Sequence, residues 1–378
     1  MKKLSIIILL VLLVFLVVGC TKEEKQKEKK NYIEDDEIKE SIFKDSYKDA
    51  SKLVTDMTIE DKIAQLFLVR YDNTYPKKYK DNPPGGYILF AKDFQNHTKD
   101  SIKEELNNTQ EISKYPLILG VDEEGGYVTR ISRFKNFRSE KFASPRYYYD
   151  EGGEKLLKET EKEKAKLLKS IGINLNLAPV ADVSTDENDF IYNRTFGRNA
   201  TETGELVKKM VEYANEFEIN SCLKHFPGYG NNEDTHTGVA IDNRDYITIK
   251  ENDYLPFKKG IEANVPCVLV SHNVINSIDS EYPASLSGKV IYELRKNLEF
   301  SGIIMTDDLA MDAVKSYVQD GNAATYAINA GNDMIITSDF DTMYNEVLNS
   351  YKEGIIKEET INKAVLRIIA WKYESNLF

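Results

Sequence analysis

Cysteine is scarce in this sequence, with three residues among 378. Cys222 and Cys267 each stand in an apolar stretch that predicts a strand, so a disulfide framework is disfavoured and two buried free thiols are expected. Positive charge is also in short supply, because 50 Lys and Arg face 62 Asp and Glu, a formal net charge of −12. Nucleic-acid binding requires clustered Lys and Arg, so we expect no nucleic-acid partner.

Long hydrophobic runs are absent except at the N-terminus. Lys2 and Lys3 precede residues 4–18, which are apolar apart from one Ser, and a glycine followed by Cys20 closes the segment. This pattern predicts a secretory signal peptide over residues 1–19, too short for an ordinary membrane span. A small residue directly before Cys resembles the bacterial lipobox, so we expect Cys20 to be lipidated and to anchor the exported protein to the outer face of the bacterial cell membrane. A plain signal peptide with a chance cysteine is the alternative.

The segment after Cys20 is rich in Lys and Glu, poor in apolar residues and without glycine. A segment of this composition buries too little apolar surface to fold by itself. We therefore assign residues 20–46 to a charged tether between the lipid and the folded domain. The domain is expected over residues 47–378.

From Met57 onward, short apolar runs alternate with amphipathic stretches. Apolar strands separated by helices predict parallel pairing in a sheet that is buried on both faces. Eight such units predict a single (β/α)8 TIM-like barrel of the α/β class. An open doubly wound sheet is the alternative, but no Gly-rich dinucleotide fingerprint follows the first run. The expected strands are residues 64–69, 86–90, 117–121, 173–177, 219–223, 266–270, 302–305 and 333–336, and helices are expected at 99–113, 154–171, 202–217, 287–298, 323–330 and 357–372.

Chemically useful side chains follow most of the apolar runs. Active sites of (β/α)8 barrels lie at the carboxyl ends of the strands, so the sequence predicts a site at that end of the barrel. Packing alone does not explain polar residues at the same end of so many strands. These residues are Asp122, Asp182, Lys224, His225, His272 and Asp307.

Two of the four histidines fall within one loop. Lys224-His225-Phe-Pro-Gly-Tyr-Gly is followed by Asn-Asn-Glu-Asp234-Thr-His236, and its Gly and Pro residues exclude regular helix or strand. Packing is a poor reason to place a scarce residue twice in a polar loop, whereas binding and proton transfer at a strand end need such side chains. An enzyme is therefore the first hypothesis.

This loop, together with the Ile-Met-Thr-Asp-Asp-Leu-Ala-Met segment that contains Asp307, resembles glycoside hydrolase family 3, and within it the β-N-acetylglucosaminidase branch. The resemblance covers about residues 50–378. Two positions depart from the family pattern: Tyr229 stands where a second loop His is common, and Glu123 stands where the family has Gln. Four further segments carry the resemblance, at residues 57–67, 121–130, 178–182 and 193–197.

The resemblance implies a division of catalytic roles. Asp307 is the expected nucleophile, which forms a covalent glycosyl-enzyme intermediate. His236 is the expected proton donor, and Asp234 is expected to orient and polarise it. An imidazole suits this role because its unperturbed pKa of about 6.5 lets it give and take a proton near neutral pH. The structural alternatives are Asp307 as a helix N-cap and His236 as a loop residue that caps a turn.

The remaining polar residues are expected to hold the sugar or to support the site. Asp122 is expected to accept hydrogen bonds from ring hydroxyls, and four residues to donate them: Arg130, Arg194, Lys224 and His225. Asp182 and His272 are expected to orient other side chains, and three further charged residues to be structural or solvated: Glu123, Glu124 and Arg198. No cofactor is implied, and no metal either, because ligand spacing such as His-x-x-x-His is missing.

The expected function is that of an exo-acting retaining glycosidase that removes terminal β-linked N-acetylglucosamine, with peptidoglycan fragments as the family's default substrate. A family 3 β-glucosidase is one alternative, although the chain ends just past the barrel and carries the Asp-x-His loop. A non-catalytic carbohydrate-binding lipoprotein is another, although such a protein has no need of Asp307, Asp234 and His236. Hydrolysis and transfer to phosphate both stay open.

Overall fold

The computed structural model describes residues 35–230, 240–311, 314, 317–318 and 322–378. The predicted signal peptide and Cys20 lie outside these residues, as do Asp234 and His236. Within the described part of the chain, no helix is both long enough and apolar enough to cross a membrane.

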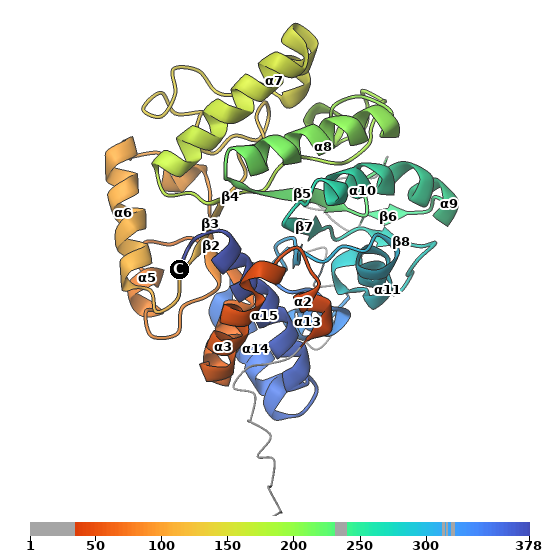
Figure 1. The fold of residues 1–378 in the computed structure, drawn as a ribbon. Helices are drawn as coiled ribbons and strands as arrows, with labels where there is room; N and C mark the ends of the chain where they lie inside the picture. The colour runs from red at the N-terminus through yellow and green to blue at the C-terminus, as the bar shows by residue number, and fades with distance from the viewer. Residues whose placement is uncertain (1–34, 231–239, 312–313, 315–316, 319–321) are drawn as a thin grey trace, which may run out of the picture.

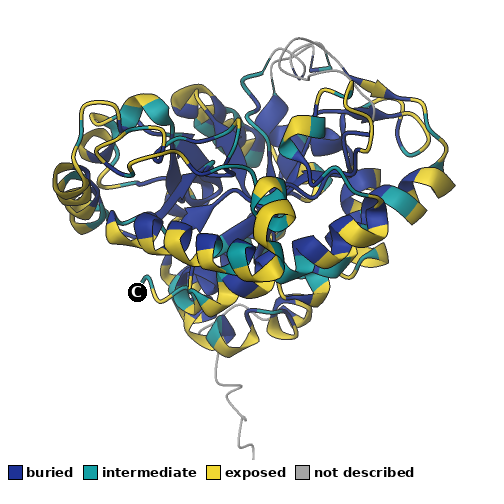
Figure 2. Cartoon of the chain, turned by 90° about the horizontal axis from the view of Figure 1, so that it is seen from above, coloured by how far each residue is buried: buried dark blue, intermediate teal, exposed yellow. Residues whose placement is uncertain are grey.

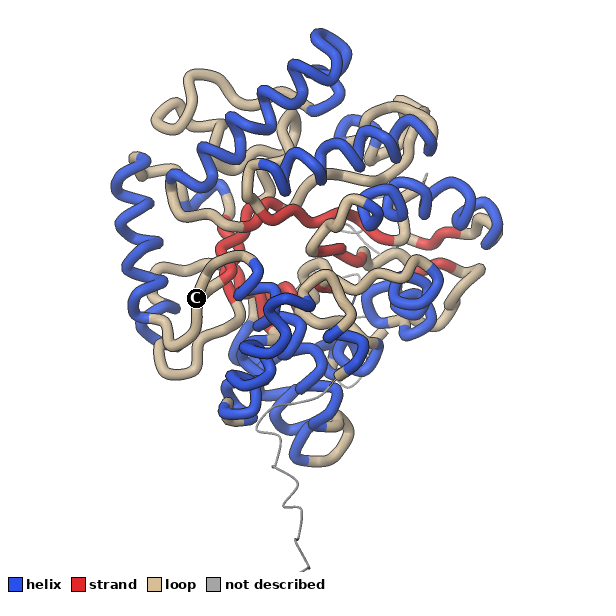
Figure 3. Tube along the Cα trace, viewed as in Figure 1, coloured by secondary structure: helices blue, strands red, loops and turns tan. Residues whose placement is uncertain are grey.

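Eight parallel strands form a nearly closed barrel surrounded by helices, which confirms the predicted (β/α)8 fold (Figures 1 and 3). The strand order is β10-β1-β2-β3-β4-β5-β7-β9. A bridge between Met305 and Met334 brings the first and last strands of this order, β10 and β9, together. A separate short parallel pair, β6 with β8, lies outside the barrel. The barrel strands are β1 (Phe67–Arg70), β2 (Gly86–Leu89), β3 (Ile118–Val121), β4 (Leu175–Asn176), β5 (Asn220–Phe226), β7 (Cys267–Val270), β9 (Ile303–Thr306) and β10 (Ile335–Thr337); the outer pair is β6 (Ile241–Asp242) and β8 (Val274–Ile275).

Each predicted apolar run overlaps one barrel strand. The prediction that the loop begins at Lys224 is wrong, because β5 continues through Lys224 and His225 to Phe226. The first run is divided between two elements. Ala64 and Gln65 end helix α4 (Ile59–Gln65), and the strand begins only at Phe67. Thr58 starts that helix, because its side chain accepts a hydrogen bond from the Asp61 amide at 3.1 Å. Apolar character alone does not separate the end of a buried helix from the start of a buried strand.

The helices cover the outside of the barrel, with one side of each buried and the other exposed to solvent (Figure 2). Helix α7 begins earlier than predicted, because Ser144 caps it and Pro145 fits its first turn, and it kinks at Gly153 (φ 62°). The main helices and helical turns are α3 (Tyr47–Asp56), α5 (Tyr75–Lys78), α6 (Lys99–Ile112), α7 (Pro145–Ser170), η3 (Tyr192–Arg194), α8 (Ala200–Glu216), α9 (Tyr246–Thr248), η4 (Ile249–Asp253), α10 (Tyr254–Glu262), η5 (Ala284–Leu286), α11 (Gly288–Tyr292), η6 (Glu293–Asn297), α13 (Ala323–Ala330), α14 (Phe340–Lys352) and α15 (Glu358–Glu374).

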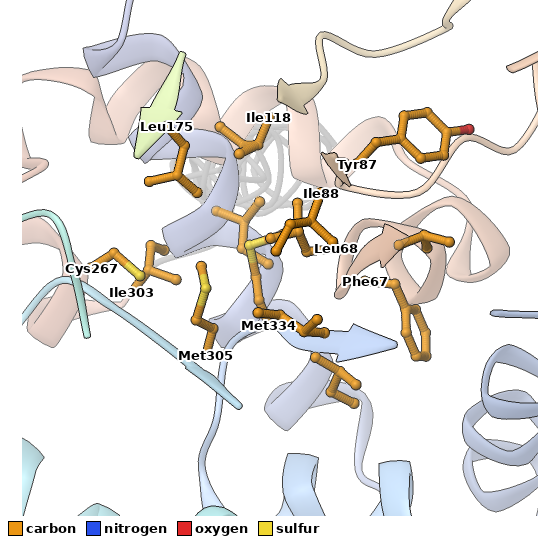
Figure 4. Packing of buried hydrophobic residues seen from close by; sticks show 14 of the residues in the cluster. Phe67, Leu68, Tyr87, Ile88, Ile118, Leu175, Cys267, Ile303, Met305 and Met334 are labelled. Atoms are coloured by element: carbon orange, nitrogen blue, oxygen red, sulfur yellow. The ribbon is translucent and has the colours of Figure 1, made fainter. Parts of the chain in front are cut away.

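One large apolar cluster joins the strands to α3, α14 and α15, and Figure 4 shows part of it. Leu68, Ile303 and Met305 are fully buried in this cluster. Burial of each such side chain contributes about 1.5–3 kcal/mol, so the strands hold the barrel rim in place. Cys222 and Cys267 also belong to the cluster, and both are buried free thiols, as predicted.

The folded domain begins earlier than predicted, so the assignment of residues 35–46 to a tether is wrong. Helix α2 (Asp36–Lys39) buries Ile38 completely, and Phe43 is 2% exposed. The backbone amide of Ile42 donates to Ser301 Oγ at 3.2 Å. The two apolar side chains Ile38 and Phe43 are enough to dock this segment on the domain. The prediction failed because it relied on the average composition of the segment, which is dominated by charged residues.

Lys372 is fully buried in α15, where its Nζ donates to Gln65 Oε1 at 2.6 Å. Burial lowers the pKa of Lys372 to about 7, against about 10.4 in an unfolded chain. Between about pH 7 and about pH 10.4, Lys372 is protonated in the unfolded chain but not in the folded protein. The free energy of unfolding therefore rises with pH in this range, by at most about 1.4 kcal/mol per pH unit from this residue. Below pH 7 the cost of burying the charge is present in full.

We therefore expect Lys372→Met to stabilise the protein more at pH 6 than at pH 10, as measured by thermal unfolding at both pH values. The control is Lys52→Met, because the Lys52 side chain is 52% exposed on α3. That substitution is expected to change Tm equally at the two pH values. An equal effect of Lys372→Met at both pH values would show that Lys372 keeps an ordinary affinity for its proton.

Candidate active site

The polar residues singled out in the sequence lie at the carboxyl ends of five neighbouring strands, which meet at one rim of the barrel because the strands are parallel. Asp122 follows β3, and Lys224 and His225 lie in the last part of β5. His272 comes after β7, and Asp307 comes directly after β9. Phe226 pairs with Val270, and Val270 with Thr306, so the ends of β5, β7 and β9 are level with one another.

Lys224 is the centre of a buried cluster of charges. Its Nζ lies 2.7 Å from Asp122 Oδ1 and 2.6 Å from Glu124 Oε1, and its side chain is 3% exposed. Burial alone would lower the pKa of Lys224, but the two carboxylates outweigh burial and raise that pKa above its ordinary value. Lys224 is therefore a fixed cation.

Glu124 joins Lys224 to Arg194, which comes from the helical turn η3. The guanidinium grips the carboxylate with two nitrogens, Nε at 3.1 Å and Nη2 at 2.8 Å. Burial alone would raise the pKa of Glu124, but Lys224 and Arg194 hold it well below its usual range. A bidentate pair of this kind fixes both side chains in position.

His225 extends the cluster to Asp182, which follows β4. Its Nε2 lies 3.1 Å from Arg194 Nη2, and its Nδ1 lies 2.8 Å from Asp182 Oδ2. A guanidinium has no acceptor, so Nε2 accepts from Arg194 and the ring proton lies on Nδ1, facing Asp182. Asp182 also accepts from the backbone amides of His225 and Tyr229, at 3.1 and 2.8 Å. Both ring nitrogens of His225 have partners inside the cluster. The assignment of His225 as a hydrogen-bond donor to the sugar stays a prediction.

Arg130 lies at the outer edge of the cluster. Its Nη2 is 3.7 Å from Asp122 Oδ2, and its guanidinium lies 5.2 Å from the centre of the Phe90 ring. Glu123 is fully buried and accepts from the backbone amides of Arg130 and Ile131, at 2.7 and 2.8 Å. Glu123 is therefore structural, as predicted, because it holds the backbone that presents Arg130.

Exposure rises from the inside of the cluster to its outside. The Lys224 and Glu124 side chains are 3% and 4% exposed, whereas those of Asp122 and Arg130 are 14% and 26% exposed. The inner ions fix the outer two, which leaves a carboxylate acceptor and a guanidinium donor at the surface of the rim. Adjacent donors and acceptors that are already held in place suit the hydroxyl groups of a sugar ring.

Asp307 is half-buried at the end of β9, and its backbone amide donates to Val270 O at 2.9 Å. Its Oδ1 accepts from the Asp308 amide at 2.8 Å. Asp308, and not Asp307, caps the following turn: its Oδ1 accepts from the backbone amides of Ala310 and Ser338, at 2.9 and 3.3 Å. Burial raises the pKa of Asp308. The two aspartates therefore have different roles, and Asp308 shapes the turn that carries Asp307.

His272 supports the same turn from β7, as predicted for an orienting residue. Its Nε2 lies 3.0 Å from the carbonyl oxygen of Asp308, and its Nδ1 lies 2.8 Å from Ser285 Oγ. The carbonyl only accepts, so Nε2 carries a proton and donates it to Asp308.

Gly228 and Gly230, at the end of the described chain before residue 231, pack against the ion pair of Arg244 and Asp253. Arg244 binds Asp253 with two nitrogens, at 2.9 and 3.0 Å. A Cβ on Gly228 (φ 122°) would come within 2.5 Å of the Asp253 carboxylate, and a Cβ on Gly230 (φ 57°) would clash with Arg244. Only glycine fits at these two positions, which lie directly before the undescribed residues 231–239.

Glu124 is the site residue whose importance the sequence reasoning missed. The sequence predicts a structural or solvated role for Glu124 and Arg198 alike, but only Arg198 forms a surface pair, with Asp150. The sequence contains no separate signal for Glu124, because residues 122–124 follow β3 in irregular backbone, where the side-chain alternation of a strand does not apply.

We expect Glu124→Gln to reduce kcat/KM on the order of 10²-fold, because it leaves Lys224 and Arg194 without their shared counter-charge. The matched control is Glu163→Gln, which removes an exposed carboxylate paired with Arg138 and should leave kcat/KM unchanged. Steady-state kinetics on an aryl glycoside measure both effects. A Glu124→Gln value close to that of the control would show that the cluster does not prepare the site.

A parallel barrel with a fixed donor and acceptor cluster and an accessible aspartate on one rim defines a glycoside hydrolase with a (β/α)8 catalytic domain. The chain belongs to glycosyl hydrolase family 3, because the model of that family's N-terminal domain matches residues 58–371.

Related proteins agree with this family. The chain is 31% identical, over 70% of its length and 74% of the other protein's, to a β-hexosaminidase of Hydrogenovibrio crunogenus. A family 3 β-N-acetylglucosaminidase from Paenibacillus sp. str. FPU-7 has a similar fold, with 24% identity and a TM-score of 0.78 over 85% of this chain, which spans 63% of that protein. A β-N-acetylhexosaminidase from Beutenbergia cavernae gives 24% identity and a TM-score of 0.74 over 84% of this chain and 99% of its own.

Proposed function

We propose that the protein is an exo-acting retaining β-N-acetylglucosaminidase, which hydrolyses terminal non-reducing β-linked N-acetylglucosamine. The observation that carries the proposal is the half-buried Asp307 on the same barrel rim as the Asp122–Lys224–Glu124–Arg194 cluster. Identity to a named β-hexosaminidase supports the choice of sugar.

In the first step, the Asp307 carboxylate attacks the anomeric carbon, and the bond to the leaving oxygen breaks. His236 gives its proton to that oxygen, so the aglycone departs as a neutral alcohol and the sugar stays bound to Asp307 as an ester. In the second step, His236 takes a proton from water, whose oxygen attacks the same carbon and releases Asp307. Two inversions give net retention. Asp234 stabilises the imidazolium form of His236, which is present before the first step and forms again in the second.

The cluster binds the sugar without taking part in proton transfer. Asp122 accepts from ring hydroxyls and Arg130 donates to them, while Lys224 holds Asp122 in position.

The test is a comparison of kcat/KM on p-nitrophenyl β-N-acetylglucosaminide and p-nitrophenyl β-glucoside. We expect a clear preference for the acetamido sugar. A preference for the glucoside would identify a β-glucosidase, and no turnover of either would favour a non-catalytic binding protein. An increase of rate with phosphate, with a sugar phosphate as the product, would replace hydrolysis by phosphorolysis.

The natural substrate in this proposal is a peptidoglycan fragment in which N-acetylglucosamine is linked to N-acetylmuramic acid. The basis is the family resemblance of the loop and the barrel segments. Release of free N-acetylglucosamine from purified fragments of this kind tests the assignment. Failure to cleave them, with normal turnover of the aryl glycoside, would direct the search to other GlcNAc-terminated glycans.

The proposed location is the outer face of the bacterial cell membrane, with Cys20 carrying the lipid. A single acyl chain binds a membrane only marginally, so stable retention requires the diacyl anchor of lipoproteins. We expect Cys20→Ala to release the protein from the membrane fraction or to block its processing. If that variant is processed to the wild-type size and stays with the membranes, the anchor lies elsewhere.

A further inference from the structure

Cys222 and Cys267 face each other across two neighbouring barrel strands. They are register partners in the parallel pair of β5 and β7, and their sulfur atoms lie 2.6 Å apart. Neighbouring parallel strands are about 4.8 Å apart, and paired residues point to the same face. This spacing falls within the 4.4–6.8 Å between Cα atoms that a disulfide requires.

The placement of these two residues is hard to ascribe to chance. The sequence has three cysteines, and Cys20 is assigned to the lipid anchor. The other two are 45 positions apart in the chain and yet lie in direct contact. A buried residue touches roughly 6–12 others, so a random position for the second cysteine would rarely fall among the neighbours of the first.

Both thiols are free in this structure, but their contact points to a second, oxidised form. We propose that Cys222 and Cys267 are a site of covalent modification, where a disulfide forms when the chain folds in an oxidising compartment. The oxidant is a small-molecule disulfide or a protein disulfide. One cysteine thiolate attacks a sulfur of the oxidant, forms a mixed disulfide and releases a first thiol. The second thiolate then attacks the cysteine sulfur of that mixed disulfide and releases a second thiol. The protein loses two hydrogens, and the oxidant gains two electrons and two protons.

The bond forms before the barrel closes. Both cysteines are completely buried, and burial raises the pKa of the Cys267 thiol well above its ordinary value. The thiolate is the reactive form, so the folded protein offers little of it and no access to an oxidant. Once formed, the disulfide is shielded from reductants for the same reason.

The link falls where β5 needs support. The β5–β7 pairing is regular at Cys222 and Leu223, but the register shifts between Leu223 and Phe226, the stretch that carries Lys224 and His225. A disulfide just before this irregularity ties the two strands where the backbone ladder weakens. It also closes the chain segment that contains the predicted acid–base pair, which lowers the entropy of the unfolded state.

The test uses the full chain with Cys20→Ser, so that only the two barrel cysteines are present. The protein is unfolded, refolded with reduced and oxidised glutathione, and compared with the same protein refolded with reduced glutathione alone. We expect the oxidised sample to be lighter by two hydrogens, with Cys222 and Cys267 linked in its peptide map. We also expect its Tm to exceed that of the reduced sample by roughly 5 °C, as a loop of this length implies.

Cys222→Ser and Cys267→Ser, each made in the Cys20→Ser chain, complete the design, because each should have the same Tm in both buffers. Iodoacetamide added after denaturation, without reductant, labels any thiol that stays free. Labelling of both cysteines in the protein refolded with oxidised glutathione would overturn the proposal. A linked protein that melts at or below the Tm of the reduced protein would overturn it as well, because the bond would then oppose the native barrel.

Discussion

Asp307→Asn is expected to abolish turnover, with a loss of roughly 10⁴–10⁶-fold in kcat, the scale seen when a hydrolase loses its nucleophile. The physical reason is that an amide oxygen is a poor nucleophile, so the covalent intermediate does not form. The turn that carries Asp307 should survive the change. Its backbone amide bonds to Val270 O, and its side-chain oxygen accepts from the Asp308 amide, and Asn preserves both contacts.

The matched control is the neighbouring substitution Asp308→Asn. The Asp308 side chain accepts from the amides of Ala310 and Ser338, and the Asn oxygen accepts the same bonds. We therefore expect activity within about an order of magnitude of wild type and a small change in Tm. If Asp308→Asn lost activity as completely as Asp307→Asn, the separate roles given to the two aspartates would be wrong.

His236→Ala is expected to slow the reaction in proportion to the need of the leaving group for a proton. General acid assistance is worth about 10²–10⁴-fold, so a natural disaccharide should lose about that much. An activated aryl glycoside, whose aglycone departs as a stable anion, should lose far less in the first step. The measurement is kcat/KM for a series of aryl glycosides of increasing aglycone pKa, in wild type and variant.

Asp234→Asn is expected to give a weaker form of the same pattern, because it keeps the imidazole and removes only its ionic partner. Equal losses for His236→Ala on good and poor leaving groups would assign His236 to binding or to structure. The proton donor would then have to be sought among other residues.

The barrel could be predicted from the sequence because each strand is a short apolar run with a polar residue after it. Cys267–Val270 and Ile303–Thr306 are such strands, buried on both faces of the sheet. This burial makes the run continuous, so the signal does not depend on side-chain alternation. The boundary between a helix and a strand cannot be predicted in this way where both lie in one apolar run, as at Gln65.

The contacts between distant segments could not be predicted in the same way. Residues 35–46 dock through Ile38 and Phe43, and a charged composition hides two isolated anchors. Glu124 matters because Arg194, 70 positions away, comes to lie against it. Cys222 and Cys267 meet only because β5 and β7 are neighbours in register. Each of these contacts joins residues that are far apart in the sequence. The folded structure is needed to show that they meet.

The central claim is that Asp307 carries the sugar during the reaction, and the most direct measurement is trapping with a slow 5-fluoro derivative of β-N-acetylglucosamine. The 5-fluoro group slows both steps and leaves the acetamido group in place, so the ester accumulates. Peptide mass mapping after trapping is predicted to find the fluorosugar on Asp307, and the Asp307→Asn protein is predicted to acquire none. A label on another carboxylate, or inactivation without any covalent sugar, would contradict the account.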